Sequence, residues 1–422
     1  MNKLNLFNLH TLIRIFFFFI FLNYLYFSIR LTIRENSWIA GDWLMNYEAG
    51  ILRRGFSGEI ILLISKISSI SVTYLLIFIQ TSLFLTFLYF LFNILYKKKI
   101  NLWFLFLLFS PVTIAFTFYD PLTVGRKEVI FFAFYTIYVS FLLKNLKWSI
   151  IRNLAYFLIG CIFVLIHEIF IFFSTFFIFS KIFYLYKKNI KINIINLSNE
   201  LFLIIGSLIA AIILVFFSSN DPNLKELVCN RLIDNGLSPE ICTGALTEIF
   251  FSNYLNSYKS FGLFEYIISY GYIKTYTIAI LLFFTPLILF LFFQKLDKKD
   301  IKIFIIFLIF QLIFVASIFI VVNDWGRYLN IYFILILVFV SYFFLEEKVR
   351  EIKKFNFKRL IIVFFLILYA ASWHMPHCCQ KNLGKGLESF KDRIFFRINN
   401  TTNYNDLSRK IILKLLRVNE HK

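Results

Sequence analysis

Charged residues are scarce in this chain: Asp, Glu, Lys and Arg make up only 16% of its 422 residues. Soluble globular domains carry about 25% of such residues, so the shortage excludes an ordinary soluble fold. Glycine and proline are also few, at 14 and 6 residues, but their scarcity carries no information about function. The five cysteines form no CxxC pair and no zinc-ligand spacing, which argues against a metal–thiolate site.

Apolar residues make up 60% of the chain, aromatic residues 21%, and the mean hydropathy is +0.77. Apolar runs of about 20 residues recur, which matches the hydrocarbon thickness of a bilayer, and a spanning segment must satisfy its own backbone as a helix. The sequence therefore predicts an integral membrane protein. Its formal charge of +20 comes from short Lys and Arg clusters between the apolar runs. These clusters favour orientation by the positive-inside effect and attraction to anionic lipids rather than binding to nucleic acid.

The runs predict an all-α fold, a polytopic transmembrane helical bundle of about eleven spans, or about ten if residues 360–373 do not cross. The first span, residues 11–29, lacks a signal-peptide cleavage site, so we expect a retained signal anchor with the N-terminus inside. Basic clusters flank the apolar region 154–186 at both ends, which favours two short helices that turn near His167 and Glu168. The other expected spans are residues 72–96, 102–119, 129–143, 201–217, 272–293, 303–322 and 329–345. Residues 1–373 thus form one transmembrane domain, and residues 374–422 form a basic tail with an interfacial amphipathic helix.

This topology puts polar loops on the outer side of the membrane, at residues 30–59, 120–128, 218–262 and 323–328. A polar loop is ordinary where water is present, and an exposed ion pair contributes under about 1 kcal/mol. Charged clusters that recur on one side, in loops too short to need so many charges, nevertheless favour a site. In the longest of these loops, Cys229 and Cys242 form either a disulfide or two free thiols.

The cations of these clusters are suited to a phosphate group. Asp is followed shortly by Gly-Arg in two loops, and a consecutive Arg pair lies between two glycines. Glycine lets the backbone approach a ligand, arginine offers a planar fork, and a pyrophosphate needs several fixed cations. The aromatic rings beside them either stack on sugars or belong to the aromatic belt of the interface. The candidate substrate-binding residues are Arg53, Arg54, Asp120, Arg126, Lys127, Glu128, Asp324, Arg327, Trp43, Tyr47 and Trp325.

Acidic residues and a histidine near these cations supply the other half of a sugar transfer. The reaction needs a base for the acceptor hydroxyl and a stabiliser for the leaving phosphate. The candidate catalytic residues are Asp42, Glu48, His167 and Glu168. An unperturbed histidine titrates near neutral pH, but His167 is equally a helix-end residue bonded to Glu168 or to a carbonyl.

The number of spans, the acidic Asp42 in the first outer loop, and further Asp, His and Arg residues on the same side resemble a known class. These are the multispanning enzymes of bacterial envelope glycan assembly: polyprenyl-phosphate-dependent glycosyltransferases of the C-type fold, and O-antigen or capsule polymerases. The resemblance covers the whole chain as architecture and rests on few matched residues. It implies that Asp42 acts on the acceptor or on a metal, and that the pyrophosphate binds Arg53, Arg54, Arg126 and Arg327. The paired acidic dipeptide often found in the first loop of the C-type enzymes is absent here.

Three hypotheses follow. The first is a membrane glycosyltransferase or glycan polymerase that uses a polyprenyl-(pyro)phosphate-linked sugar at the outer face of the cytoplasmic membrane, with no certain cofactor and a divalent metal left open. The second is a transporter or flippase for a polar or lipid-linked substrate. Such a protein should show polar residues at mid-membrane depth and Gly- or Pro-broken helices, and only Gln311 and Pro286 stand out in this way. The third is a non-catalytic partner in envelope assembly.

Overall fold

The protein is all-helical, as the sequence predicts. A computed structural model describes residues 9–144, 148–218, 221–251, 267–294, 296–319, 322–346, 357–378, 382–384 and 386. Within these ranges there is no strand, and an isolated antiparallel bridge joins His374 to Gly384. Seven helical segments in the described ranges are long and apolar enough to cross a membrane, and two shorter helices are also apolar.

The longer helices are α1 (Leu9–Ile33), α4 (Val72–Tyr96), α7 (Val129–Ser140), α8 (Ile150–Ile166), α10 (Thr175–Lys187), α11 (Ser198–Phe217), α16 (Tyr272–Phe293), α17 (Lys298–Phe319), α18 (Trp325–Phe343) and α19 (Phe357–Ser372). The shorter ones are α2 (Ala40–Trp43), α3 (Gly55–Ser68), α5 (Leu102–Leu108), α6 (Phe116–Tyr119), η1 (Pro121–Thr123), η2 (Leu142–Lys144), α9 (Phe170–Phe173), η3 (Pro222–Leu224), α12 (Lys225–Asp234), η4 (Pro239–Cys242) and α13 (Ala245–Phe251). The candidate span Phe170–Lys187 combines α9 with α10.

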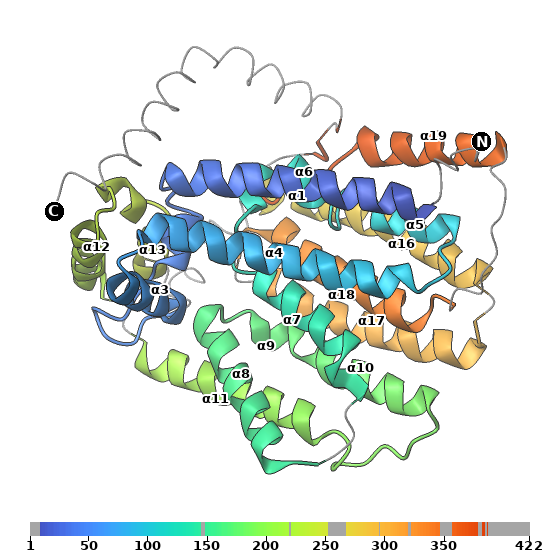
Figure 1. The fold of residues 1–422 in the computed structure, drawn as a ribbon, viewed down its shortest axis with the longest axis horizontal. Coiled ribbons are helices and arrows are strands. Elements are labelled where there is room, and N and C mark those ends of the chain that lie inside the picture. The colour runs from blue at the N-terminus through green and yellow to red at the C-terminus, as the bar shows by residue number, and fades with distance from the viewer. Residues whose placement is uncertain are drawn as a thin grey trace, which may run out of the picture.

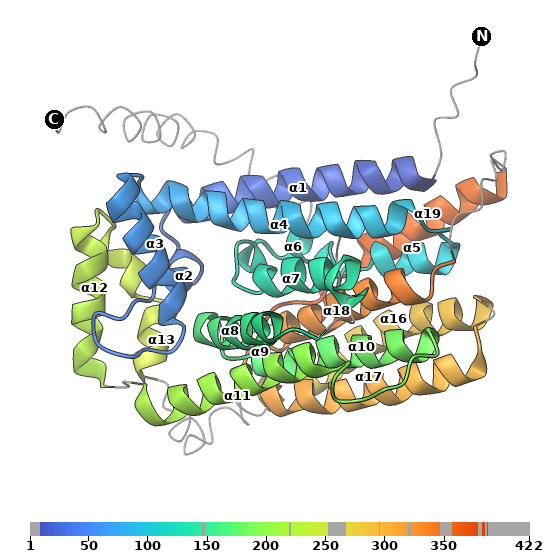
Figure 2. The same ribbon diagram turned by 60° about the horizontal axis from the view of Figure 1, so that its bottom comes forward.

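Most of the long helices run roughly along the long axis of the molecule, with α1 and α4 side by side (Figures 1 and 2). The central helix is α18: 89% of its span is buried inside the protein, whereas only 33% of α1 or α4 is buried. At one end of the bundle, α2, α3, α12 and α13 gather over the helix ends (Figure 2). A disulfide between Cys229 and Cys242 joins α12 to η4 there. Of the two alternatives that the sequence left open, a disulfide or two free thiols, the structure has the disulfide.

Glycine sets the approach of α8 to α11. A Cβ on Gly160 would lie 2.2 Å from the carbonyl oxygen of Leu203, and one on Gly206 would lie 2.2 Å from that of Phe157. Ser207 on α11 adds a hydrogen bond from its hydroxyl to the carbonyl of Gly160 on α8, at 3.4 Å. Small residues at such contacts let two helix backbones pack closely within a membrane.

The predicted span at residues 102–119 is not one continuous helix. Residues 102–119 form the short helices α5 and α6, separated by turns around Pro111. Proline has no backbone N–H and disfavours helical geometry in the residue before it, so the helix ends before Pro111. The predicted turn near His167 agrees with the structure, where α8 ends at Ile166 and α9 begins at Phe170. The predicted interfacial helix of the tail falls outside the described residues.

Candidate functional site

The loop between α1 and α3 folds inward instead of lying over the surface. Its short helix α2 buries both Asp42 and Trp43, and the indole nitrogen of Trp43 donates to the carbonyl of Gly125 at 2.6 Å. Gly58 packs directly against the backbone of Leu44 and Met45, where a Cβ would lie 1.9 Å from the carbonyl oxygen of Met45. Close packing against this glycine and the bond to the second polar loop therefore bring Asp42 into the protein interior.

Arg54 links two carboxylates. Its backbone is left-handed, with φ of 63°, just before α3 begins. The guanidinium donates from Nε and Nη2 to the carboxylate of Glu168, each at 2.8 Å, and from Nη1 to Asp42 at 3.2 Å. Such a fork between arginine and a carboxylate fixes geometry as well as charge. Arg54 thereby ties the first loop to the turn after α8.

Lys127 is fully buried on the other side of Asp42. Its Nζ donates to the backbone carbonyls of Arg54 and Ile166, at 3.0 and 3.2 Å, and lies 3.9 Å from Asp42 Oδ1. Burial lowers the pKa of Lys127 to about 8, and Asp42 partly opposes this effect. Lys127 therefore retains most of its charge at neutral pH.

Asp42 is entirely buried. Burial is the largest single effect and would raise its pKa, but the positive charges around it, those of Lys127 and Arg54 foremost, together hold the pKa of this carboxyl below its ordinary value. Within the described part of the chain, Oδ2 of Asp42 has no hydrogen-bond partner. An ionised carboxylate with one oxygen unused is unusual in a protein interior, and it can bind a hydroxyl group or a cation.

His167 follows α8 and is also fully buried. Its Nδ1 lies 3.5 Å from Glu168 Oε2 and its Nε2 lies 3.8 Å from Glu128 Oε1, but neither nitrogen makes a hydrogen bond to any described residue. Burial, reinforced by the charge of Arg54, lowers the pKa of His167 below its ordinary value. The ring is therefore neutral at pH 7 and able to accept a proton.

A second buried ion pair lies at the beginning of α18. Arg327 donates from Nε to Glu128 Oε1 at 3.1 Å and makes a second, shorter bond from Nη2 to the same oxygen. Its Nη1 donates to Asp324 at 2.5 Å. Glu128 Oε2 has no hydrogen-bond partner among the described residues. Because Glu128 also approaches His167, the two ion-pair groups lie next to each other.

Arg126 makes no ion pair with any described carboxylate; it donates to the carbonyls of Leu122 and Trp38, at 3.0 and 2.7 Å. Burial lowers the pKa of Arg126 to about 10, and the charge of Arg327 adds to this effect. Arg126 and Arg327 both line one small cavity of about 30 Å³, which is large enough for a water molecule and has a mostly apolar wall. The remaining residues around this cavity are Tyr24, Phe84, Phe116, Thr117, Thr123, Glu128, Val129, Phe132 and Asn330.

The structure brings together most of the predicted site residues. The connected group, which we call the ion-pair cluster, contains Asp42, Arg54, Lys127, Glu128, His167, Glu168, Asp324 and Arg327. Arg126 lies beside it and lines the same cavity as Glu128 and Arg327. The helix ends that carry it are those expected on one side of the membrane. At the other helix ends, ion pairs join Lys99 to Glu346 and Lys187 to Asp300.

Four predicted site residues lie apart from the cluster. Glu48 is half-exposed and lies 3.3 Å from Arg231 on α12. Arg53 donates from Nη2 to the carbonyl of Ile249 on α13, at 3.2 Å. Tyr47 covers Gly55. Trp325 stacks on Phe319 and donates its indole N–H to the carbonyls of Phe319 and Val322.

Trp43 remains beside the cluster, but the residue is only 2% exposed. Neither tryptophan therefore presents an open face on which a sugar could stack in this conformation.

Sequence reasoning missed His377. Its Nδ1 lies 2.5 Å from Asp120 Oδ2, and its backbone N–H donates to the same oxygen at 3.1 Å. Its carbonyl accepts from the backbone N–H of Gly326, at 3.0 Å, so the segment after α19 packs over the beginning of α18. The signal that could have found it is the group of His and Cys residues directly after a short apolar run.

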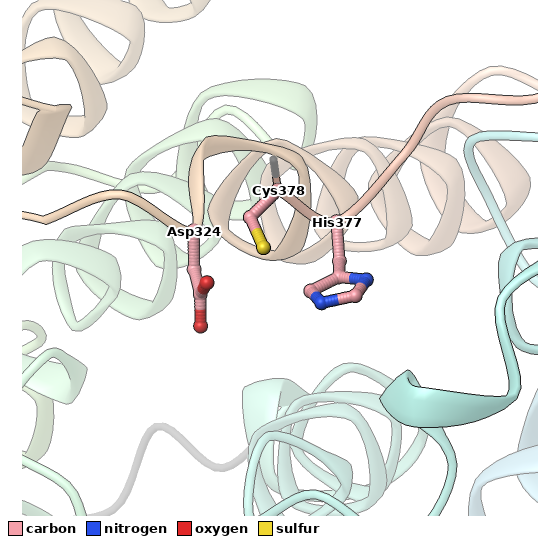
Figure 3. Close-up of side chains that lie close together, drawn as sticks. All are labelled: Asp324, His377 and Cys378. Atoms are coloured by element: carbon pink, nitrogen blue, oxygen red, sulfur yellow. The ribbon is translucent and has the colours of Figure 1, made fainter. Parts of the chain in front are cut away.

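One group of residues in the described ranges could hold a metal ion. A carboxylate oxygen of Asp324, a ring nitrogen of His377 and the sulfur of Cys378 lie within 4.8 Å of one another (Figure 3). Cys378 is disulfide-bonded, so its sulfur is not available as a thiolate.

No family model, curated protein or solved structure matches this chain. A function for the chain therefore rests on the chemistry of the cluster and on its place in the bundle.

Proposed function

We propose that this chain is a membrane glycosyltransferase or glycan polymerase that takes a sugar from a polyprenyl-(pyro)phosphate-linked donor. The observation that carries the proposal is Asp42, a buried and ionised carboxylate with one oxygen unused. It lies at the same end of the bundle as two arginines that border one cavity. The basic clusters at the other helix ends favour an orientation with those ends in the cytoplasm and the ion-pair cluster outside.

The leaving group of the reaction is a lipid phosphate or pyrophosphate. Arg327 already has two carboxylate partners. Arg126 donates only to backbone carbonyls, so its guanidinium can bind a phosphate. Fixed cations that face the leaving oxygen stabilise the charge that develops as the sugar–phosphate bond breaks. Arg126 and Arg327 take this role.

The acceptor hydroxyl must lose a proton as its oxygen bonds to the sugar. With its lowered pKa, Asp42 is a weak proton acceptor, so its unused oxygen orients the hydroxyl and stabilises positive charge on the sugar ring. The neutral His167 takes the proton. Arg54 and Lys127 hold Asp42 in place. Because Asp42 and His167 are fully buried, the substrates reach them only after the covering segments move.

A transporter or flippase is the second candidate. The observation that favours it is the complete burial of Asp42 and His167. Closed networks of paired charges are also found in transport proteins, where they break and re-form as a pathway opens.

The test is a transfer assay with the full chain in lipid nanodiscs, a polyprenyl-pyrophosphate oligosaccharide as substrate, and chain growth as the readout. We expect Asp42→Asn and Arg126→Ala to lower the rate by about 10²-fold or more. Glu226→Gln and Arg34→Ala, which change exposed residues outside the cluster, serve as matched controls and should retain the rate. No product from any polyprenyl-linked donor, together with substrate-dependent flux in sealed vesicles, would sink the enzyme proposal in favour of transport.

A further inference from the structure

His377 is held as a metal-binding histidine usually is. Its Nδ1 lies 2.5 Å from a carboxylate oxygen of Asp120, and that oxygen also accepts the backbone N–H of His377. An Nδ1–H that donates to a carboxylate leaves the lone pair on Nε2. Carboxylates hold metal-ligating histidines in this way, fixing both the tautomer and the direction of the ring.

The other ring nitrogen of His377 faces the side on which Asp324 lies (Figure 3). A carboxylate oxygen of Asp324 lies within 4.8 Å of a ring nitrogen of His377, a separation that one cation between the two can bridge. Oδ2 of Asp324 is taken by Arg327, which holds this carboxylate in position and leaves Oδ1 for a metal. The Asp324 and His377 side chains are 29% and 17% exposed, so an ion can reach them from outside.

The ligand set selects the kind of cation. The disulfide at Cys378 removes the soft thiolate that would favour zinc, and one carboxylate and one imidazole remain. A cation of the Mn²⁺ or Mg²⁺ class is usually held by one or two protein ligands and completes its shell with water and substrate phosphate oxygens.

The charges around these two ligands disfavour a cation alone. Asp324 feels the positive charges of both Arg327 and Arg126, which offset the negative charges of Asp324 and Asp120. A diphosphate near the two arginines would reverse this balance. The cation and the diphosphate should therefore bind cooperatively.

We propose that Asp324 and His377, with Asp120 as the positioning residue for His377, form a site for a Mn²⁺-class divalent cation that binds together with a diphosphate. Only the choice of a diphosphate rests on the proposed function. The site is separate from Asp42 and is made from the beginning of α18 and the segment after α19.

The test measures protein-bound Mn²⁺ by electron paramagnetic resonance, with the full chain in nanodiscs and with or without inorganic pyrophosphate. We expect pyrophosphate to raise the Mn²⁺ affinity of the wild type by about tenfold or more. His377→Gln and Asp324→Asn should lose that gain, and Asp120→Asn should keep part of it. The matched control is His374→Gln, because the ring of His374 stacks on Tyr119 and lies outside the ligand set.

Equal Mn²⁺ affinity in the wild type and in His377→Gln would overturn the site, and so would the lack of any effect of pyrophosphate. Thermal unfolding of each variant shows whether a loss of binding reflects a loss of fold. The assay contains no sugar donor, so a failure of glycosyl transfer leaves its result standing. Conversely, glycosyl transfer that continues in His377→Gln and in the presence of a chelator would show that the reaction needs no metal at this site. The proposed function would then stand without the metal.

Discussion

Arg54 and Glu168 are 114 residues apart in the chain and form an ion pair, with two hydrogen bonds of 2.8 Å, between the loop after α1 and the turn after α8. Both side chains are largely buried, with exposed fractions of 17% and 18%. The same guanidinium also binds Asp42. One side chain therefore holds the proposed catalytic carboxylate and fastens its loop to the bundle.

Arg54→Lys should weaken this connection although the charge remains. Lysine is a point charge without the planar fork, so it cannot bind Glu168 through two parallel bonds and Asp42 at the same time. We expect a loss of about 2 kcal/mol in the free energy of unfolding, less than for complete removal of a buried partner. The measurement is thermal unfolding of the variant in nanodiscs, followed by intrinsic fluorescence.

Arg231→Lys is the matched control. Arg231 also makes two bonds to one carboxylate, that of Glu59, but both side chains are more exposed, at 26% and 31%. A solvent-screened pair contributes under about 1 kcal/mol. If both variants lost the same stability, burial would not be what makes the Arg54 pair strong.

Lys127 should give the protein a stability that rises with pH in the alkaline range. Its folded pKa is about 8, below the ordinary value of 10.5, because it is buried. Between these values the unfolded chain binds more protons at Lys127 than the folded chain does, so the free energy of unfolding increases with pH by up to about 1 kcal/mol per unit. Comparing the melting temperatures of wild type and Lys127→Met from pH 8 to 9.5 isolates this contribution. If the melting temperatures of the two proteins changed with pH in the same way, the lowered pKa of Lys127 would be contradicted.

The disulfide between Cys229 and Cys242 should fix α12 over the first loop. It closes a loop of 13 residues, for which chain entropy predicts a stabilisation of about 3 kcal/mol. α12 carries Arg231, the partner of Glu48 and Glu59, so the double variant Cys229→Ala/Cys242→Ala should release this contact. Faster limited proteolysis between residues 221 and 251 is the expected result. Cys161→Ala, which removes a cysteine outside any disulfide, is the control and should be cleaved like the wild type.

The sequence was sufficient to predict that most of these residues share one end of the bundle, because successive apolar runs bring alternate loops to the same end. It was not sufficient to predict which side chains meet. Arg53 and Arg54 are chemically identical neighbours, yet only Arg54 reaches the cluster, because its left-handed backbone turns it towards Glu168. That dihedral angle depends on packing around the loop.

The contact of His377 with Asp120 was beyond prediction for a related reason. The two residues are 257 positions apart, and they meet because the segment after α19 turns back over Gly326, where a Cβ would collide with the carbonyl of Pro376. Periodicity says nothing about the path of an irregular segment. By contrast, the break in the apolar run 102–119, which we predicted as one span, could have been predicted, since Pro111 lies in its middle.

The close approach of α8 to α11 depends on its two glycines. A methyl group at Gly160 or at Gly206 would overlap a backbone carbonyl of the facing helix, which no change of rotamer can relieve, so each Gly→Ala substitution must push the helices apart. We expect a loss of about 1–3 kcal/mol for either variant, measured by thermal unfolding in nanodiscs. Ala155→Leu, which adds a larger side chain on the exposed face of α8, is the control and should be neutral.

The double variant Gly160→Ala/Gly206→Ala gives a sharper result than either single one. Both methyl groups would enter the same interface, so the separation that accommodates the first also makes room for the second. The combined loss in the free energy of unfolding should therefore be smaller than the sum of the single losses, by about 0.5 kcal/mol or more. Strictly additive losses would mean that the two glycines act at independent contacts and that the helices do not separate as rigid bodies.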